Sequence, residues 1–446
     1  MRMIGRWLAG SAALVVMMAA AHAQVLFSED FEGDAPLEAR GWTVAAEEAQ
    51  STWTVVDGAL RIVCHRSPYQ GGRISREVPA VQRGVLELDC LLAEEGYANY
   101  DHLSLGIKLF GHMFSFKRYS GHHLMAYRPG ENVWYDITGA VALGQWVHLR
   151  MEFDIPAGRV EYYLGDAPDP LVIDTRLPMA IEGETGPLEI FNYGLTKGTV
   201  AHRVDNIVLR GLGAAEEAPV QRDRALVFEG PTSERYACAR IIADALGPER
   251  VSVYTMATRG AATTPRNKLT LDRVPGSATW RQARWVVLAD VAAGPDDCLP
   301  PHLIADIERA VREGANLLVL GGPFALGKGA YPGTPLEGLL PVALGGPWEL
   351  RRSDGPQRLD DVEQPPAVLW YHDAPPRGEA EVSLSAGDHA LLVSWQVGEG
   401  RAGVFLGTTL GDAADFGTAE PFWDWDGWPD LLLQMAGITG DGGGAQ

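Results

Sequence analysis

The hydrophobic pattern changes once along the chain, near Arg224, and this change limits the architectures that the chain can adopt. Over 25–212, short segments alternate apolar and polar residues with a period of two, and Gly, Pro, Asp or Asn separate them. In 146–155, for example, apolar residues occupy the odd positions from 147 and polar residues the even positions from 148. Such alternation gives each strand one buried and one wet face, and predicts an antiparallel all-β sandwich.

Beyond residue 224 apolar strands alternate with amphipathic helices. The expected strands are 224–230, 250–257, 283–291, 315–322, 390–398 and 400–409, and the expected helices are 233–247, 300–314 and 429–438. Strands of this kind, each followed by a helix, predict a parallel sheet covered on both faces. We therefore expect a multi-domain chain: an all-β sandwich over 24–212, a linker over 213–224, an α/β domain over 225–440 and a disordered tail over 441–446.

The first 23 residues predict export. Arg2 and Arg6 precede an apolar run from about Trp7 to Ala20, and Ala21-His22-Ala23 has the small-x-small pattern of a signal peptidase site. We expect a signal peptide over 1–23 and a mature chain from Gln24, in the periplasm or outside the cell. No later segment is long and apolar enough for a membrane anchor.

The charge balance argues against two classes of partner. The formal net charge is −21, and an acidic surface repels both the phosphate backbone of nucleic acids and anionic membranes.

Four cysteines, at 64, 90, 238 and 298, occur in an oxidising context. Bridges Cys64–Cys90 and Cys238–Cys298 are open alternatives to buried free thiols, because spacing cannot decide between them.

Three segments of the first half match a known pattern. They are an acidic-aromatic opening at 27–34 (FSEDFEGD), a W-x-V-x-D-G-x-L match at 53–60 (WTVVDGAL) and a D-x-I-x-L close at 205–209 (DNIVL). The first domain thereby resembles the concanavalin A-like (laminin G-like) jelly-roll family, and this resemblance implies a jelly-roll sandwich.

Several segments of the second half also match a known pattern. They are 286–290 (VVLAD), the helix that ends at Gly314, Gly321-Gly322, the loop with Gly327, Gly329 and Tyr331, 339–342 (LLPV) and 398–407 (GEGRAGVFLG). By these segments the second half resembles the class I glutamine amidotransferase-like superfamily, in particular its exported bacterial members, and the resemblance implies a flavodoxin-like α/β fold.

The catalytic apparatus of such enzymes is not found in the sequence. An amidotransferase needs a thiolate on a sharp strand-to-helix turn and a His-x-Glu pair to accept its proton. Cys238 falls in an expected helix, Cys298 in an Asp-Pro loop, and His372-Asp373 has the wrong spacing. The segment 322–329 (GPFALGKG) is close to a phosphate-binding loop, but it ends in Gly where a hydroxyl is needed, so we expect a glycine-rich surface loop. We predict a domain without glutaminase activity.

Residues of the first domain suggest three candidate sites. Glu87 and Asp89 share one face of a strand, as do the catalytic acids of laminarinase-type glycosidases on the same fold. Tyr97, Tyr100, His102, His112, His122 and Tyr127 could line one sheet and bind a sugar by ring stacking and hydrogen bonds. Asp30, Glu32 and Asp205 (with Asp34) could meet at the paired ends of the domain and hold a structural Ca²⁺, the one cofactor that the sequence suggests.

The segment 423–430 (WDWDGWPD) mixes aromatic residues and carboxylates densely, and we interpret it first as a packed loop before the last helix and second as a ligand contact. Taken together, the sequence favours an exported, non-catalytic protein that binds a carbohydrate or a cell-envelope component. Two alternatives stay open, a glycoside-active enzyme that uses Glu87 and Asp89, and a protein-interaction scaffold.

Overall fold

The chain forms two compact units, Met1–Glu217 and Ala218–Gln446, in a computed structural model. The boundary falls within the segment 213–224 that was expected to be a linker. The residues that the structure describes are 23–45, 51–64, 72–95, 104–119, 123–128, 133–136, 144–175, 181, 183–192, 200–213, 220–259, 268–271, 273–293, 299–360, 362 and 364–438. Residues 1–22 of the predicted signal peptide and the C-terminal tail lie outside them, whereas Ala23 is described as the first residue of a strand.

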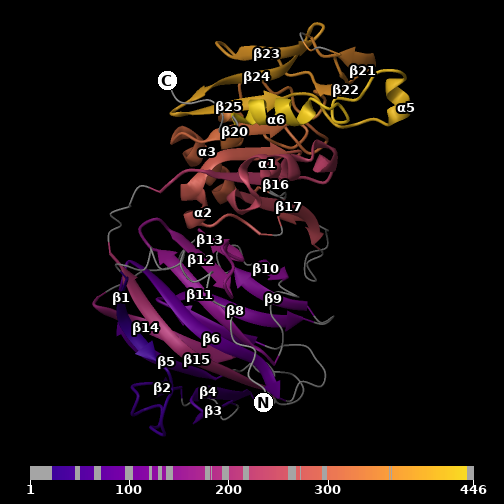
Figure 1. The fold of residues 1–446 in the computed structure, drawn as a ribbon. Coiled ribbons are helices and arrows are strands. Elements are labelled where there is room, and N and C mark those ends of the chain that lie inside the picture. The colour runs from indigo at the N-terminus through magenta and orange to yellow at the C-terminus, as the bar shows by residue number, and fades with distance from the viewer. Residues whose placement is uncertain are drawn as a thin grey trace, which may run out of the picture. The chain divides into compact units, whose positions relative to one another are not determined.

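The first unit consists of two antiparallel sheets (Figure 1, indigo to magenta). One has the order β13-β12-β11-β6-β15-β4-β3, with β1 also paired to β15. Its strands are β1 (Ala23–Glu29), β3 (Ser51–Val56), β4 (Ala59–Cys64), β6 (Arg83–Glu95), β11 (Trp146–Asp154), β12 (Arg159–Leu164), β13 (Val172–Asp174) and β15 (Val200–Leu212).

The other sheet has the order β10-β9-β8-β7-β14-β5-β2. Its strands are β2 (Thr43–Val44), β5 (Arg73–Pro79), β7 (Ser104–Leu109), β8 (His112–Tyr119), β9 (His123–Arg128), β10 (Val133–Asp136) and β14 (Thr185–Asn192). Side chains of both sheets form a single core, among them Leu88, Leu149, Ile107 and Ile190. Burying each such side chain contributes about 1.5–3 kcal/mol. The predicted all-β sandwich is confirmed, and it is consistent with a jelly roll.

Local sequence explains the strands of this unit. Leu149, Met151 and Phe153 of β11 are buried and the polar residues between them are half-exposed, as the period-two pattern predicts. The β3–β4 hairpin turns at Asp57-Gly58, where both φ angles are positive, +53° and +70°. An Asp-Gly pair is favoured in such two-residue hairpin turns because both positions need the left-handed region.

The second unit is built on an eight-stranded sheet of order β18-β17-β16-β19-β20-β25-β24-β23. The five strands from β17 to β25 are mutually parallel, and β18, β24 and β23 pair antiparallel at the two ends. The strands are β16 (Arg224–Glu229), β17 (Val251–Arg259), β18 (Lys268–Leu271), β19 (Ala283–Ala289), β20 (Asn316–Leu320), β23 (Glu381–Ala386), β24 (His389–Val397) and β25 (Gly400–Phe405).

Helices cover both faces of this sheet. The helices of the described part of this unit are η4 (Ser233–Tyr236), α1 (Cys238–Leu246), η5 (Pro248–Arg250), α2 (Ser277–Gln282), α3 (Pro301–Arg312), α4 (Pro335–Leu339), α5 (Ala413–Phe416) and α6 (Trp428–Ala436). On one face α2, α3 and α4 pack against Leu226, Val286 and Leu317, and on the other α1 and α6 pack against Val227 and Val287. A separate two-stranded sheet joins β21 (Leu350–Arg358) to β22 (Ala367–His372).

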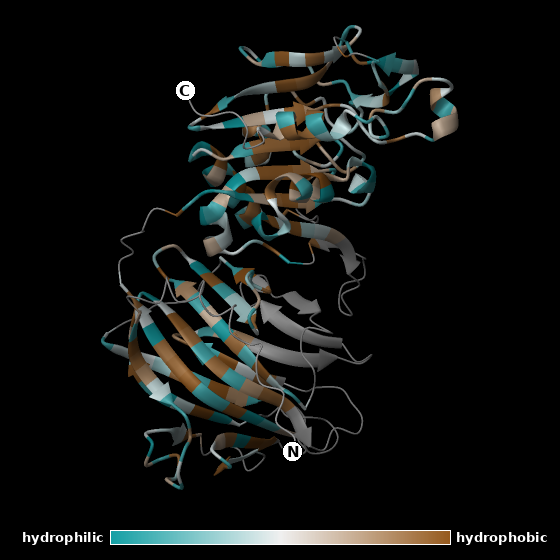
Figure 2. Cartoon of the chain, viewed as in Figure 1, coloured by the Kyte–Doolittle hydropathy of each residue, from teal (hydrophilic) through white to brown (hydrophobic). Residues whose placement is uncertain are grey.

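Burial on two faces explains the composition of the central strands. In Figure 2 the strands of the first unit alternate hydrophobic and hydrophilic residues, whereas β16, β19 and β20 are more continuously hydrophobic. The residues of β19 from Trp285 to Ala289 are all buried. Alternation is typical of a sandwich strand with one wet face, and a continuous hydrophobic run is typical of a parallel strand between two helix layers.

Candidate functional site

The carboxyl ends of the central parallel strands define one edge of the second unit. The chain passes from β16 to β17 on one side and then to β19 on the other, so the strand order reverses between β16 and β19. In open sheets of this kind, ligands bind outside the carboxyl ends of the strands near such a reversal. The segments that leave the sheet there are Gly230–Thr232 after β16, Asp290 after β19 and Gly321-Gly322 after β20.

Asp290 ties these three segments together. Its side chain is buried, and it accepts hydrogen bonds from the Thr232 hydroxyl and, at 2.6 Å, from the backbone N–H of Phe324. Its backbone is left-handed, with φ of +55°. A Cβ on Gly322 would lie 2.2 Å from the Asp290 carboxylate, so the close approach of the two loops requires glycine. Burial raises the pKa of Asp290 from 3.8 to about 6, against the opposing effect of these hydrogen bonds.

A buried His–Glu pair lies behind the same edge. His372 Nδ1 is 3.2 Å from Glu349 Oε1, and the Gly322 N–H donates to His372 Nε2 at 3.1 Å. Glu349 also accepts the N–H groups of Gly327 and Gly345, at 2.6 and 2.8 Å. This pair does not form a His-x-Glu motif in the sequence, because its members are 23 residues apart in the chain.

These contacts correct the expectation for the segment 322–329. It is not a surface loop, because Ala325, Leu326 and Gly327 are buried. Its backbone donors are also used internally, since Phe324 donates to Asp290 and Gly327 to Glu349. A phosphate group would find these two N–H groups already bound to carboxylates, which argues against a phosphate-binding loop.

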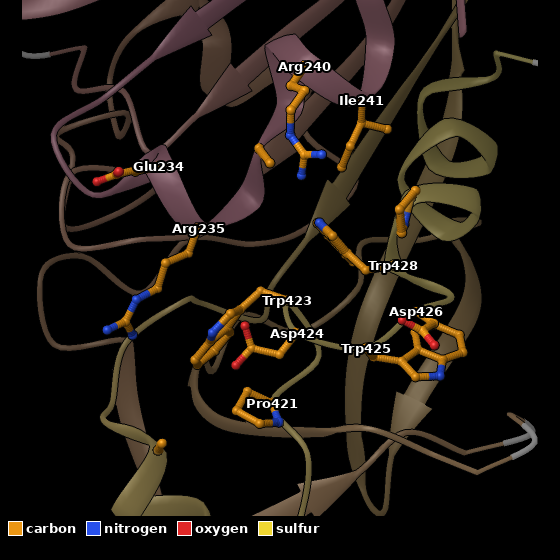
Figure 3. Close-up of a pocket in the computed structure, with 13 residues that line it drawn as sticks. Glu234, Arg235, Arg240, Ile241, Pro421, Trp423, Asp424, Trp425, Asp426 and Trp428 are labelled. Atoms are coloured by element: carbon orange, nitrogen blue, oxygen red, sulfur yellow. The ribbon is translucent and has the colours of Figure 1, made fainter. Parts of the chain in front are cut away.

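A pocket of about 620 Å³ opens in the second unit between η4 and α1 on one side and the segment before α6 on the other (Figure 3). Arg240 and Ile241 enter it from α1, and Pro421, Trp423 and Asp424 lie opposite. The full lining is Glu234, Arg235, Ala237, Arg240, Ile241, Ala413, Pro421, Trp423, Asp424, Trp425, Asp426, Trp428 and Pro429. Its volume lies within the range of small-molecule pockets, about 300–1,000 Å³.

The three tryptophans of the pocket have different environments. Trp428 is buried, and its indole N–H donates to the Tyr236 carbonyl at 2.9 Å, so it forms a fixed wall. Trp423 and Trp425 are half-buried and offer part of their rings to the pocket. Trp425 rests on Gly427, where an added Cβ would come within 2.2 Å of the indole. A side chain at position 427 would therefore displace Trp425.

The charged side chains of the pocket also divide into two groups. Arg235 donates to the carbonyls of Thr409 and Gly411, at 2.9 and 2.6 Å, and lies 5.3 Å from the centre of the Trp423 ring. By contrast, Arg240, Glu234, Asp424 and Asp426 are exposed, and within the described part of the chain they have no hydrogen-bonded or ion-pair partner of their own side chains.

Of this site, the sequence had suggested only the segment 423–430, as a second interpretation. Trp428 is packed, as the first interpretation expects. Trp423 and Trp425 line the pocket, and the ligand contact stays a prediction. Arg235 and Arg240 were missed. A signal was available, because they follow the first parallel strand and therefore leave the sheet at the edge where ligands bind.

Glu87 and Asp89, the candidate acids of the first unit, share one face of β6, as predicted, and both have partners. Glu87 accepts from Arg210 at 3.1 Å, and His148 Nδ1 lies 2.8 Å from Asp89. The second oxygen of Asp89 accepts from the Asn206 amide at 2.8 Å. The two acids thus belong to a polar network that spans β6, β11 and β15.

The predicted sugar-binding set of the first unit is not supported at His112. This imidazole is buried, stacks on Tyr162 at 5.8 Å between ring centres and points into the sandwich, not onto an open face. The expectation was wrong because His112 shares its strand face with the buried Phe114. Tyr97, Tyr100, His102 and His122 lie outside the described residues, as does the side chain of Tyr127.

The three candidate calcium ligands lie within electrostatic range of one another. Burial is the main cause that raises the pKa of Asp205, and Asp89, Glu32 and Asp30 raise it further. Asp30 accepts the N–H of Glu32 at 3.1 Å, and Asp205 that of Asn206 at 2.7 Å. Across the residues described, no group of three or more His, Cys, Asp or Glu side chains is arranged to hold a metal ion. The arrangement gives no support to a calcium site.

The cysteines for which the structure describes side chains are free. Cys90 and Cys238 are buried thiols, so neither candidate bridge is formed. Burial raises the pKa of both thiols, which keeps them protonated and poorly nucleophilic. Cys298 lies outside the described residues.

Comparisons with known proteins give no family. No family model matches the chain, and no curated protein matches it. Similar solved structures include a cytoplasmic protein from Salmonella typhimurium (16% identity, 48% of this chain and 98% of that chain, TM-score 0.35). A sialidase (9%, 50% and 21%, TM-score 0.33) and the Emp47p carbohydrate recognition domain (9%, 43% and 99%, TM-score 0.30) are similar to the same degree.

None of the helices in the described ranges is long and apolar enough to cross a membrane.

Proposed function

We propose that this chain is a carbohydrate-binding protein and that the second unit holds the sugar in the pocket between η4, α1 and the segment 421–429. One observation carries the proposal. Two half-exposed indoles, Trp423 and Trp425, share a pocket of about 620 Å³ with charged side chains, such as Arg240, that have no partner among the described residues. Flat aromatic rings stack on the apolar C–H face of a sugar ring, and carboxylates and guanidinium groups hydrogen-bond its hydroxyls.

The exposed charged side chains of the pocket are better placed to bind a ligand from solution than to stabilise the fold. An unpaired buried charge is costly, but Arg240, Asp424 and Asp426 are exposed and keep their hydration when the pocket is empty. A sugar can replace that water with hydrogen bonds of similar strength. The indole of Trp428 and the backbone of Gly427 fix the geometry of the wall in advance.

The test is a glycan array with the purified chain, followed by calorimetric titration of the sugars that bind. We expect Trp425→Ala to weaken binding at least about tenfold, which corresponds to about 1.4 kcal/mol. Gly427→Ala should weaken it similarly because the new Cβ displaces the indole. Trp348→Ala is the matched control, because Trp348 is 81% exposed and does not line the pocket. If no glycan binds, or if both pocket variants bind like the unchanged chain, the proposal is wrong.

We further propose that binding proceeds without catalysis. The partners of Glu87 and Asp89, together with the buried thiol of Cys238, support this part of the proposal. Reducing-sugar release from the bound glycans and ammonia release from glutamine measure the two candidate reactions. If the glycans are hydrolysed and this turnover is lost in Glu87→Gln, the function is glycoside hydrolysis and the proposal of binding without catalysis is wrong.

The proposed compartment is outside the cytoplasm, on the basis of the segment 1–23. Mass spectrometry of the chain recovered from each cell fraction tests this. We expect an exported chain that begins at Gln24, whereas a cytoplasmic chain that retains the first 23 residues would contradict it.

A further inference from the structure

Among the described residues, the pocket lining has more unpaired negative side chains than unpaired positive ones, and this excess affects which ligands the pocket favours. Three carboxylates line the pocket, those of Glu234, Asp424 and Asp426, against the guanidinium groups of Arg235 and Arg240. Arg235 is committed to the carbonyls of Thr409 and Gly411. Only Arg240 is then left to meet a ligand as a cation, whereas none of the three carboxylates has a partner within the described ranges.

The aromatic side chains of the pocket also favour a positively charged ligand. The faces of indole rings carry negative partial charge and attract ammonium groups within about 6 Å. Arg235 already uses this attraction at one face of Trp423, 5.3 Å from the ring centre. Trp425 has no such cation within the described residues, so its free face is available to a ligand.

The field of the whole chain acts in the same direction. With a formal net charge of −21, the protein attracts cations and repels anions over distances of about a Debye length, roughly 8 Å at physiological ionic strength. A sugar that carries a carboxylate or sulfate would have to overcome this repulsion and the three lining carboxylates, with Arg240 as its one uncommitted counter-charge. A neutral sugar gains nothing from the field.

We infer that the pocket prefers amino sugars, that is, sugars with a free protonated amine, over their N-acetylated and acidic counterparts. This inference rests on the proposed carbohydrate-binding function and specifies its ligand class. The amine would lie near Asp424 or near Asp426, with the apolar face of the sugar ring on Trp425. Arg240, on the opposite side of the pocket, would hydrogen-bond hydroxyl groups.

The experiment titrates the full chain with three sets of oligosaccharides of equal length: glucosamine oligomers, N-acetylglucosamine oligomers and galacturonic acid oligomers. We expect the glucosamine oligomers to bind about tenfold more tightly than the N-acetylated ones and the acidic ones to bind least. Added salt should reduce the preference, because it screens the charges.

Variants of the lining separate charge from shape. Asp424→Asn with Asp426→Asn keeps the size of the side chains and should remove most of the preference for the amine while binding of the N-acetylated oligomers persists. Asp388→Asn is the matched control, since Asp388 is an exposed carboxylate outside the pocket. Arg240→Gln should increase the preference for the amine.

The outcomes distinguish the two levels of the proposal. If N-acetylated or acidic oligomers bind as tightly as glucosamine oligomers, the inference is overturned and the carbohydrate-binding function stands. If none of the three binds and the glycan array is also negative, both are overturned. If the amine is preferred equally in the Asp424/Asp426 double variant, the lining carboxylates are not the cause and the inference is wrong.

Discussion

The carboxylate of Asp290 accepts a hydrogen bond from the hydroxyl of Thr232, and this contact joins the end of β19 to the segment that follows β16. Thr232 directly precedes η4, which carries Glu234 and Arg235 into the pocket. The Thr409 hydroxyl donates to the carbonyl of Thr232 at 3.2 Å, and Arg235 donates back to the Thr409 carbonyl at 2.9 Å. A buried acid at the edge of the sheet thus supports one wall of the candidate site.

Asp290 should make stability depend on pH. Its pKa in the folded chain is about 6, above its ordinary value of 3.8, chiefly because burial disfavours the charged form. The folded state therefore binds the proton more tightly than the unfolded state, and the contribution of this group to stability falls as pH rises from about 4 to about 6. Two pKa units correspond to at most about 3 kcal/mol.

Asp290→Asn isolates this effect. The difference in free energy of unfolding between the unchanged chain and the variant should fall between pH 4 and pH 7, as measured by urea denaturation at each pH. A difference that stays constant, or that rises over this range, would contradict the assignment. Sugar binding by the variant should also weaken, because the η4 segment loses its anchor.

Substitution of Glu349 should strongly lower the free energy of unfolding of the second unit. Its buried carboxylate accepts two backbone N–H groups, from Gly327 and Gly345, and contacts His372. Glu349→Ala leaves all three groups without a partner, so we expect a loss of about 3–5 kcal/mol in the free energy of unfolding. Glu379→Gln, at an exposed residue, should change it by less than about 0.5 kcal/mol. Equal urea midpoints for the two variants would refute the role of Glu349.

Much of the local structure could be predicted from the sequence because it depends on neighbours in the chain. The hairpin at Asp57-Gly58, the buried face of β11 and the strand β19 follow from turn chemistry and from the spacing of apolar residues. The inward position of His112 could also have been predicted. It stands two residues before Phe114, and alternate residues of a strand share a face.

The candidate site could not be predicted in this way. Tyr236 and Trp428, which meet behind the pocket, are 192 residues apart, and only the order of the strands brings their segments together. The same holds for Glu349 and His372, which a local motif does not connect. The short helices α2 and α4 were missed because helices of six and five residues carry too few turns to show a hydrophobic period. The resemblance of the second unit to amidotransferases stays a prediction.

In the first unit, His112 should make stability fall as the pH falls, which is the opposite of the effect expected for Asp290. Burial lowers the pKa of its imidazole from 6.5 to about 4, although Asp174 of β13, 3.8 Å away, partly opposes the change, and Tyr162 of β12 stacks on the ring. The unfolded state then binds the proton more tightly, so the stability contributed by this group is lost as pH falls from about 6.5 to about 4. The loss is at most about 3 kcal/mol.

Replacement of His112 by Phe keeps the ring stack and removes two ring nitrogens that have no hydrogen bond among the described residues. We expect His112→Phe to be neutral or stabilising at pH 7 and to gain stability over the unchanged chain as the pH falls to 5. The readout is the urea midpoint at both values. A variant that is less stable at pH 5 than the unchanged chain would show that the imidazole has a polar role in the core.

Two glycines of the second unit should respond in opposite directions to alanine. Gly322 leaves no room for a Cβ, which would lie 2.2 Å from the Asp290 carboxylate, so Gly322→Ala must separate the loops that Asp290 joins. Gly338 is exposed in α4 and has nothing within 4 Å of an added Cβ. Alanine there should favour the helix by up to about 1 kcal/mol, because glycine loses more backbone entropy on folding.

The two variants control for each other, because each adds one methyl group to the same unit. We expect Gly322→Ala to lower the urea midpoint and to weaken sugar binding, since the displaced Asp290 no longer holds Thr232 and η4. Gly338→Ala should raise the midpoint slightly and leave binding unchanged. Normal stability and binding in Gly322→Ala would show that the loops can separate without loss, and that the carboxylate of Asp290 does not position the pocket.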